Sequence, residues 1–352
     1  PMYFIIGVWG GPRRIYAAVK FFLFTMVGSV LMLVAILYLA WFHHQQTGVW
    51  SYSYLDFLQT APLLPTSGGL LAPGLLVFAA FLLAFAIKVP IFPLHTWLPD
   101  AHVEAPSTGS VLLAGVLLKM GTYGLLRFNR ALLPDAWEIF APLLMVLAVI
   151  GIIYGALVAM VQPDVKKLVA YSSVSHLGFV VLGLAAGTQA STQGAILQMV
   201  NHGLTTGALF LLVGMLYERT YTRLIERYGG LAEVMPIFTG IFLVVTLGSI
   251  GLPGLNGFVG EFLILAGSWA VHPVAVIFAG LGIILSAVYM LWMVERVFWG
   301  PVDITANFAL PDINLREVFV VAPLVVLIVW LGIDPYSFLE PMEASVRLVL
   351  AR

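Results

Sequence analysis

The chain has 352 residues, of which 61% are hydrophobic and only 9% are charged, and its mean hydropathy is +1.03. Soluble globular domains contain roughly 25% charged residues, so this composition predicts an all-α protein that crosses a membrane many times. The net charge of −1 argues against a nucleic-acid partner. The lack of cysteine excludes thiolate-ligated zinc and ordinary cysteine-bound iron–sulfur clusters.

A helix that spans a bilayer needs about 20 mainly apolar residues. By that measure the sequence predicts about nine full crossings after a partial first helix near Met2–Trp9. Because that first stretch resembles the end of a longer helix, we expect upstream helices to be missing before Pro1. The predicted crossings are 16–41, 75–97, 107–128, 137–161, 165–186, 193–217, 236–271, 274–298 and 317–333.

Two of the predicted crossings are interrupted. Pro90 and Pro93 fall inside the crossing 75–97, and a glycine-rich run at 251–257 divides the crossing 236–271. Proline removes a backbone donor, which is tolerated at membrane depth only where protein or water satisfies the freed carbonyls. Paired broken helices are the usual indication of an ion site in transporters.

The basic residues fall mostly on one side of the predicted bundle. With alternating crossings, four arginines lie on one side and ten lysines and arginines on the other, which the positive-inside rule predicts to be cytoplasmic. The ten are Arg13, Arg14, Lys20, Lys166, Lys167, Arg219, Arg223, Arg227, Arg296 and Arg316. The remaining two basic residues, Lys88 and Lys119, fall inside predicted crossings.

Lys88 and Lys119 are the main candidates for a functional site. They lie 15 residues before and 16 residues after Val103, in two apolar segments joined by a polar stretch at 98–106 that is predicted to be a turn. A helical hairpin would place both ammonium groups at a similar depth. A lysine at that depth costs several kcal/mol and usually faces a bundle interior with a function, although snorkelling to the interface is the alternative.

Glu261 is the only acidic residue well inside a predicted crossing, directly after the glycine-rich break. It is a candidate proton carrier, or alternatively a carboxylate close to the headgroups. His176 and His202 lie near mid-span on consecutive crossings, and Gln198, Asn201, His202 and Thr205 form one polar stripe of a helix.

Histidine titrates near neutrality, so this stripe predicts a wet proton path, whereas hydrogen bonding between packed helices is the alternative. His95, beside the first break, is a weaker candidate for the same path. The spacing of the histidines gives no metal motif, and no phosphate-binding loop is present, so we expect no cofactor or metal in this chain.

Four runs resemble the antiporter-like subunits of respiratory complex I. They are AFAIKVPIFPLHTWLPDAHVEAPSTGSVLLAGVLLKMGTYGLLRF, QPDVKKLVAYSSVSHLGFV, NHGLTTGALFLLVGMLYERT and LPGLNGFVGEFLIL. The resemblance extends over essentially the whole chain. The opening residues 1–25, together with a glutamate at position 261, favour one member of that family over its sister subunits.

The resemblance implies about fourteen transmembrane helices built on two inverted five-helix repeats. Residues 1–128 would be a truncated first repeat, 137–298 the second, and 317–352 the last helix and C-terminal tail of one transmembrane domain. It also implies that Lys88, Lys119, His202 and Glu261 line a hydrated polar axis. The family's glutamate partner of Lys88 would lie upstream of Pro1.

The function that follows from the resemblance is proton translocation coupled to quinone reduction elsewhere in an NADH:quinone oxidoreductase. NADH, FMN, iron–sulfur clusters and quinone would bind to partner subunits, and this chain would do no redox chemistry. A bacterial inner membrane, the lipid bilayer and other membrane subunits of complex I are the expected surroundings. A Mrp-type cation/proton antiporter, a membrane-bound energy-converting hydrogenase, and an inert scaffold remain alternatives.

Overall fold

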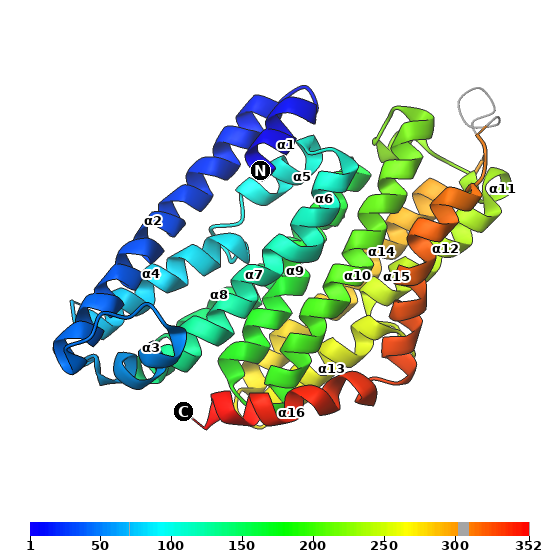
Figure 1. The fold of residues 1–352 in the computed structure, drawn as a ribbon. Coiled ribbons are helices and arrows are strands. Elements are labelled where there is room, and N and C mark those ends of the chain that lie inside the picture. Colours follow the sequence, from blue (N-terminus) through cyan, green and yellow to red (C-terminus); the bar gives the residue numbers. More distant parts are fainter. Residues whose placement is uncertain (70, 302–309, 352) are drawn as a thin grey trace.

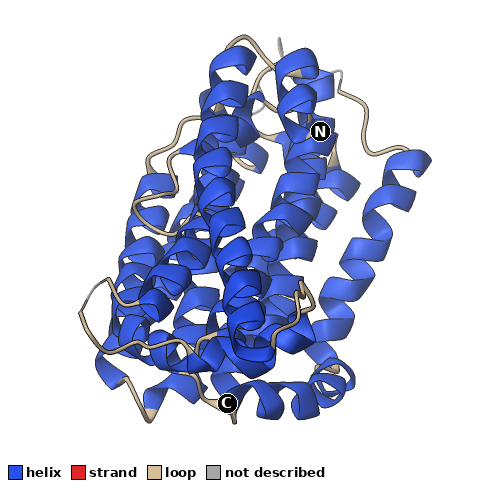
Figure 2. Cartoon of the chain, turned by 60° about the vertical axis from the view of Figure 1, so that its left-hand side comes forward, coloured by secondary structure: helices blue, strands red, loops and turns tan. Residues whose placement is uncertain are grey.

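The computed structural model describes residues 1–69, 71–301 and 310–351, and all named elements in those ranges are helices (Figure 2). Seven helical stretches there are long and apolar enough to cross a membrane. They are α2 (Arg14–Thr47), the stretch Ser107–Arg130, α8 (Pro134–Met160), α9 (Val165–Ala186), α10 (Gln189–Thr220), α14 (Pro273–Phe298) and α15 (Leu315–Ile333). The polytopic all-helical class is confirmed, whereas the number of nine crossings stays a prediction.

Both predicted breaks are present. The first interrupted crossing is α4 (Pro73–Lys88), which ends at the lysine, followed by an irregular stretch and the short helix α5 (Trp97–Glu104). The second is α12 (Pro236–Ile250), followed by α13 (Asn256–Trp269). Gly251, between α12 and α13, has φ 84°, a left-handed conformation that glycine adopts without steric cost.

The stretch Ser107–Arg130 is not a uniform α-helix. It consists of α6 (Ser107–Leu112), a π-helical turn at Leu113–Leu117, α7 (Leu118–Gly124) and a second π-helical turn at Leu125–Arg130. A π turn widens the helix and shifts the carbonyls away from their usual partners, and such turns occur frequently at functional sites. The first of them ends two residues before Lys119.

Three segments differ from the sequence-based expectation. The stretch 98–106, predicted to be a polar turn, is mostly the helix α5, because Pro99 falls in its first turn, where a missing backbone donor is harmless. The tail after α15 forms the helix α16 (Tyr336–Leu350), and a short helix α3 (Tyr54–Thr60) follows α2. Figure 1 shows α16 running across the lower end of the bundle, where Gln189 Nε2 donates to Glu343 Oε1 at 3.3 Å.

The helices α9 and α10 lie in the middle of the bundle (Figure 1), and nearly all side chains of α9 are buried. The close packing of α10 against α13 requires glycine at Gly194, since a Cβ there would lie 2.8 Å from the amide nitrogen of Ile264. These central helices carry the two predicted site residues His176 and His202.

One end of the bundle, called the basic end below, is the end at which α2, α6, α9 and α15 begin and α8, α10 and α14 finish. Gly11 N–H donates to the Glu104 carbonyl there at 2.9 Å, and Lys166 Nζ donates to the Ala105 carbonyl at 2.5 Å. These contacts join the α1 (Met2–Trp9) to α2 turn, the α5–α6 junction and the start of α9.

Candidate proton-transfer site

Lys119 is the second residue after the first π-helical turn, and that turn provides its first partner. Its Nζ donates a hydrogen bond to the carbonyl oxygen of Ala114, five residues earlier in the chain. The same Nζ lies 2.6 Å from Nδ1 of His202 on α10. Lys119 therefore points into the bundle toward α10, which excludes the snorkelling alternative for this residue.

Glu261 is buried, 2% exposed, in the second turn of α13. Its Oε1 accepts a hydrogen bond from Gln198 Nε2 at 3.0 Å and lies 2.9 Å from Nδ1 of His176. The neighbouring Nε2 of His176 lies 3.5 Å from the Ser249 hydroxyl. The carboxylate is thus held by side chains of α9 and α10 and does not face the headgroups.

The two histidines connect Lys119 and Glu261. The rings of His176 and His202 have centroids 6.0 Å apart, and both residues are 2% exposed. The side chains lie in the order Lys119, His202, His176, Glu261, and each can both accept and release a proton. We call these four residues the relay line. His202, His176 and Glu261 are buried, whereas Lys119 is partly buried and also lines an apolar groove on the surface of the chain. Groups of this kind held next to one another inside a bundle are the arrangement that intramembrane proton transfer needs.

A second layer of amides fixes the carboxylate end of the relay line. Asn201 Nδ2 donates to the Asn256 carbonyl at 2.7 Å, and it also donates to Gln198 Oε1 at 3.3 Å. Asn256 is the first residue of α13, so these bonds hold the start of that half-helix against α10. Gln198 in turn presents its amide nitrogen to Glu261.

Lys88 lies close to this region without direct contact with the relay line. It is the last residue of α4, and a Cβ on Gly121 of α7 would lie 2.9 Å from its Cβ. The Trp97 indole donates to the carbonyl of Ile87 at 2.8 Å, a carbonyl that the break leaves without its helical partner. Among the described residues, no side chain forms an ion pair with Lys88.

His95 is buried, but the structure does not bring it to the relay line. Its ring stacks on Phe92 at 5.7 Å and meets the edge of Tyr154 at 5.1 Å. The sequence could not show this placement, because it depends on the irregular backbone after the break. Sequence reasoning also missed Ser249 and Asn256, whose only signal is that they flank the glycine-rich break.

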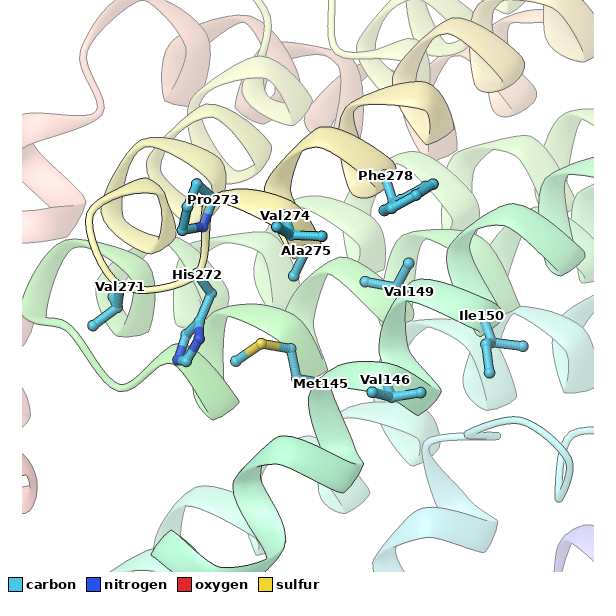
Figure 3. A pocket seen from close by; sticks show the side chains of 10 residues that line it. All are labelled: Met145, Val146, Val149, Ile150, Val271, His272, Pro273, Val274, Ala275 and Phe278. Carbon is cyan, nitrogen blue, oxygen red and sulfur yellow. The ribbon is translucent and has the colours of Figure 1, made fainter.

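One surface groove lies apart from the relay line. An apolar groove of about 460 Å³ lies between α8 and the start of α14, with His272 as its titratable residue. Figure 3 shows the side chains that line it. None of the predicted site residues lines it. Within the described ranges, no group of three or more His, Asp or Glu side chains is placed to hold a metal ion.

A helical membrane bundle with two broken crossings and a lysine–histidine–glutamate line between its helices defines the class of antiporter-like membrane subunits. Residues 1–286 match the family described as NADH:quinone oxidoreductase/Mrp antiporter, and the chain belongs to that family. It is 46% identical over 352 residues to NADH-quinone oxidoreductase subunit M of Rickettsia conorii, covering 100% of this chain and 69% of the relative. The sequence-based preference for one member of the family is therefore confirmed.

The solved structures agree with this assignment. A chain of respiratory complex I from Thermus thermophilus is 37% identical, with a TM-score of 0.89 over 99% of this chain and 72% of that chain. A chain of the Mrp complex from Dietzia has a TM-score of 0.86 over 99% of this chain and 72% of that chain, at 18% identity. The second likeness shows a shared fold only.

Proposed function

We propose that this chain is a proton-translocating membrane subunit of an NADH:quinone oxidoreductase and that the relay line carries its protons. The observation that supports the relay is the unbroken order from Lys119 through His202 and His176 to Glu261, with contacts of 2.6 and 2.9 Å at its two ends. The chain's membership of the family and its sequence identity to subunit M support its placement in an NADH:quinone oxidoreductase.

The proposed relay moves a proton stepwise along the line, from one group that can release it to the next that can accept it. When charge shifts near Lys119, its ammonium releases a proton to His202, whose Nδ1 already lies within hydrogen-bond distance. His202 passes a proton across the 6.0 Å between ring centroids to His176, with water in the gap. His176 then protonates Glu261, whose release of the proton completes one transfer.

Lys88 belongs to the proposal as the preceding group. Its position beside Gly121, two residues after Lys119, places it next to the start of the relay line. We propose that Lys88 exchanges protons with Lys119 through water, and that His95 takes no direct part in that exchange. NADH, FMN, iron–sulfur clusters and quinone would bind to partner subunits of a bacterial inner-membrane complex, and coupling would reach this chain through neighbouring membrane subunits.

The sequence similarity favours an NADH:quinone oxidoreductase over an antiporter or a hydrogenase as the complex to which this chain belongs. Identity is 46% to a subunit of NADH-quinone oxidoreductase and 18% to a subunit of an Mrp complex. Sodium transport by vesicles that do not oxidise NADH would instead support the antiporter setting.

The test replaces the ends of the proposed path in the assembled complex. Glu261→Gln keeps the size and the hydrogen bond from Gln198 but loses the titrating carboxyl, so proton pumping by native membrane vesicles should fall at least about a hundredfold, the scale of a lost general acid or base. Lys88→Ala should also cut pumping sharply. The control is Glu295→Gln, because Glu295 is exposed at the end of α14. Normal pumping in both Glu261→Gln and Lys88→Ala would overturn the proposal.

A further inference from the structure

The continuous helix α2 lies beside the first broken crossing and contacts both of its halves. On the side of α4, a Cβ added to Gly28 would lie 2.8 Å from Cα of Ala84, so the two helices touch one turn before Lys88. On the side of α5, Nζ of Lys20 lies 2.7 Å from Oδ2 of Asp100. Because α2 is unbroken between these two contacts, it spans the interruption and sets the spacing of the two halves.

The contact with α5 is an ion pair that is partly shielded from the surroundings. Lys20 lies in the second turn of α2 and Asp100 in the first turn of α5, and their side chains are 21% and 29% exposed. The Lys20 ammonium also lies 5.6 Å from the ring centroid of Tyr16. The lysine therefore reaches toward a carboxylate of the neighbouring helix and does not extend freely to the headgroups.

Stability alone does not account for an ion pair at this place. Shielding two charges from water is costly, and well-packed apolar side chains of similar size often hold two elements together as well or better. In some proteins such pairs instead serve to fix one packing arrangement among several. The Lys20–Asp100 pair is suited to that role, because it joins the second half of a broken crossing to an unbroken helix.

A series of contacts connects this pair to Lys88. Trp97 and Asp100 are three residues apart on α5 and so lie on the same face of that helix. The Trp97 ring packs against Phe21 of α2, with ring centroids 5.3 Å apart, and its indole N–H donates to the Ile87 carbonyl at 2.8 Å. A shift of α5 along α2 would therefore move the donor that holds the last turn of α4.

We propose that Lys20 and Asp100 are positioning residues for Lys88: their ion pair fixes α5 on α2 and, through Trp97, holds the end of α4 in the place from which Lys88 exchanges its proton. This inference rests on the proposed function and adds two residues to it that carry no proton themselves. Without the pair, α5 can slide along α2, and Lys88 loses its fixed distance to the relay line.

The first experiment replaces the pair by apolar side chains in the assembled complex. Lys20→Met with Asp100→Leu removes both charges and leaves neither unpaired, so the melting midpoint should stay within about 2 °C of the unchanged complex. Proton pumping should fall at least about tenfold, because small displacements of a reacting group are costly. The control is Arg347→Met with Glu343→Leu, which removes an exposed pair on α16 and should leave pumping unchanged.

A charge swap provides the rescue. Lys20→Asp with Asp100→Lys restores an ion pair between the same two helices and should recover at least about half of the pumping that the apolar replacement loses. Normal pumping with the apolar replacement, or no recovery with the swap, would overturn the proposal. A fall in the melting midpoint that accounts for the whole loss of pumping would overturn it too, because the pair would then serve stability alone.

The second experiment follows the position of residue 88 without measuring pumping. The chain has no cysteine, so Lys88→Cys introduces a single thiol into it. A small water-soluble methanethiosulfonate is added to the solubilised complex, and modification of this chain is measured by mass spectrometry. The rate should differ at least about threefold between the complex with the Lys20–Asp100 pair and the one with the apolar replacement, because thiol reactivity follows access.

The control for labelling is Tyr221→Cys, at a side chain that is 82% exposed just after α10, which should react equally in both backgrounds. Equal rates for Lys88→Cys in the two backgrounds would overturn the positioning role. Normal pumping in Lys88→Ala would instead count against the proposed function, so the two failures can be told apart.

Discussion

Nζ of Lys119 lies 2.6 Å from Nδ1 of His202, although the two residues are 83 positions apart in the chain. The lysine comes from the segment after the first broken crossing, and the histidine comes from the central helix α10. Because that helix also carries Gln198, which contacts Glu261, a single rigid element positions both ends of the relay line.

The first prediction concerns the coupling of Lys119 and His202. If they act as one unit, Lys119→Met and His202→Leu should each lower proton pumping strongly, and the double variant should be no worse than the more damaging single one. The rate of acidification of vesicles, divided by the amount of assembled complex, provides the measurement. Losses that multiply in the double variant would mean that the two residues act independently.

The second prediction concerns the packing of α13 on α10. A Cβ at Gly260 would lie 2.4 Å from Oε1 of Gln198, so Gly260→Ala should displace the amide that holds Glu261. We expect a loss of about 1–3 kcal/mol in stability, the usual cost of overpacking, together with reduced pumping.

The matched control for this change is Gly280→Ala on α14, where a new Cβ meets nothing within 4 Å. Thermal unfolding of the solubilised complex should show a lower midpoint for Gly260→Ala and no decrease for Gly280→Ala, since alanine favours a helix. Equal midpoints for the two variants would contradict the packing argument.

The third prediction concerns a buried ion pair at the basic end. Arg219 Nη2 lies 2.6 Å from Glu317 Oε2, with a second bond of 2.9 Å between Nη1 and Oε1, and both side chains are less than 10% exposed. Arg219→Met leaves the carboxylate buried without its cation, which costs about 3–5 kcal/mol for buried pairs.

The control for this pair is Arg347→Met, because Arg347 pairs with Glu343 on α16 while 65% of its side chain is exposed. Exposed pairs of this kind contribute little to stability. The melting midpoint should therefore fall for Arg219→Met and stay unchanged for Arg347→Met, and the reverse order would refute the assignment.

The fourth prediction concerns the end of α4. Trp97→Phe removes the indole donor from the Ile87 carbonyl and should cost about 1 kcal/mol, the net value of one hydrogen bond, while loosening the position of Lys88. Trp137→Phe is the comparison, since Trp137 is equally buried and its indole nitrogen has no partner in the described part of the chain. Trp97→Phe should lower proton pumping beyond what its loss of stability explains, whereas Trp137→Phe should not. The same effect in both variants would indicate a general loss of packing.

Much of the architecture could be predicted from local sequence. Pro90 and Pro93 marked the first break because proline ends a helix, and the glycine-rich run marked the second. The polar stripe of α10 was visible because Gln198, Asn201 and His202 recur at helical spacing. Each of these signals acts within a few residues of its effect.

The parts that could not be predicted depend on contacts between distant segments. The sequence did not show that Lys119 faces His202, that His95 packs away from the relay line, or that Ser249 approaches His176. The helix α16 was missed because its 15 residues are too few for a crossing. The π turn before Lys119 has no recognisable local signal.

That π turn at Leu113–Leu117 has an evolutionary consequence. A wide turn holds one more residue than an α-helix does between the same two endpoints, so it can arise from the insertion of one codon. Such an insertion rotates the preceding carbonyls and leaves both ends of the crossing in register with their neighbours. One added residue can thus give a membrane-embedded lysine an oxygen ligand at Ala114 without any new polar side chain.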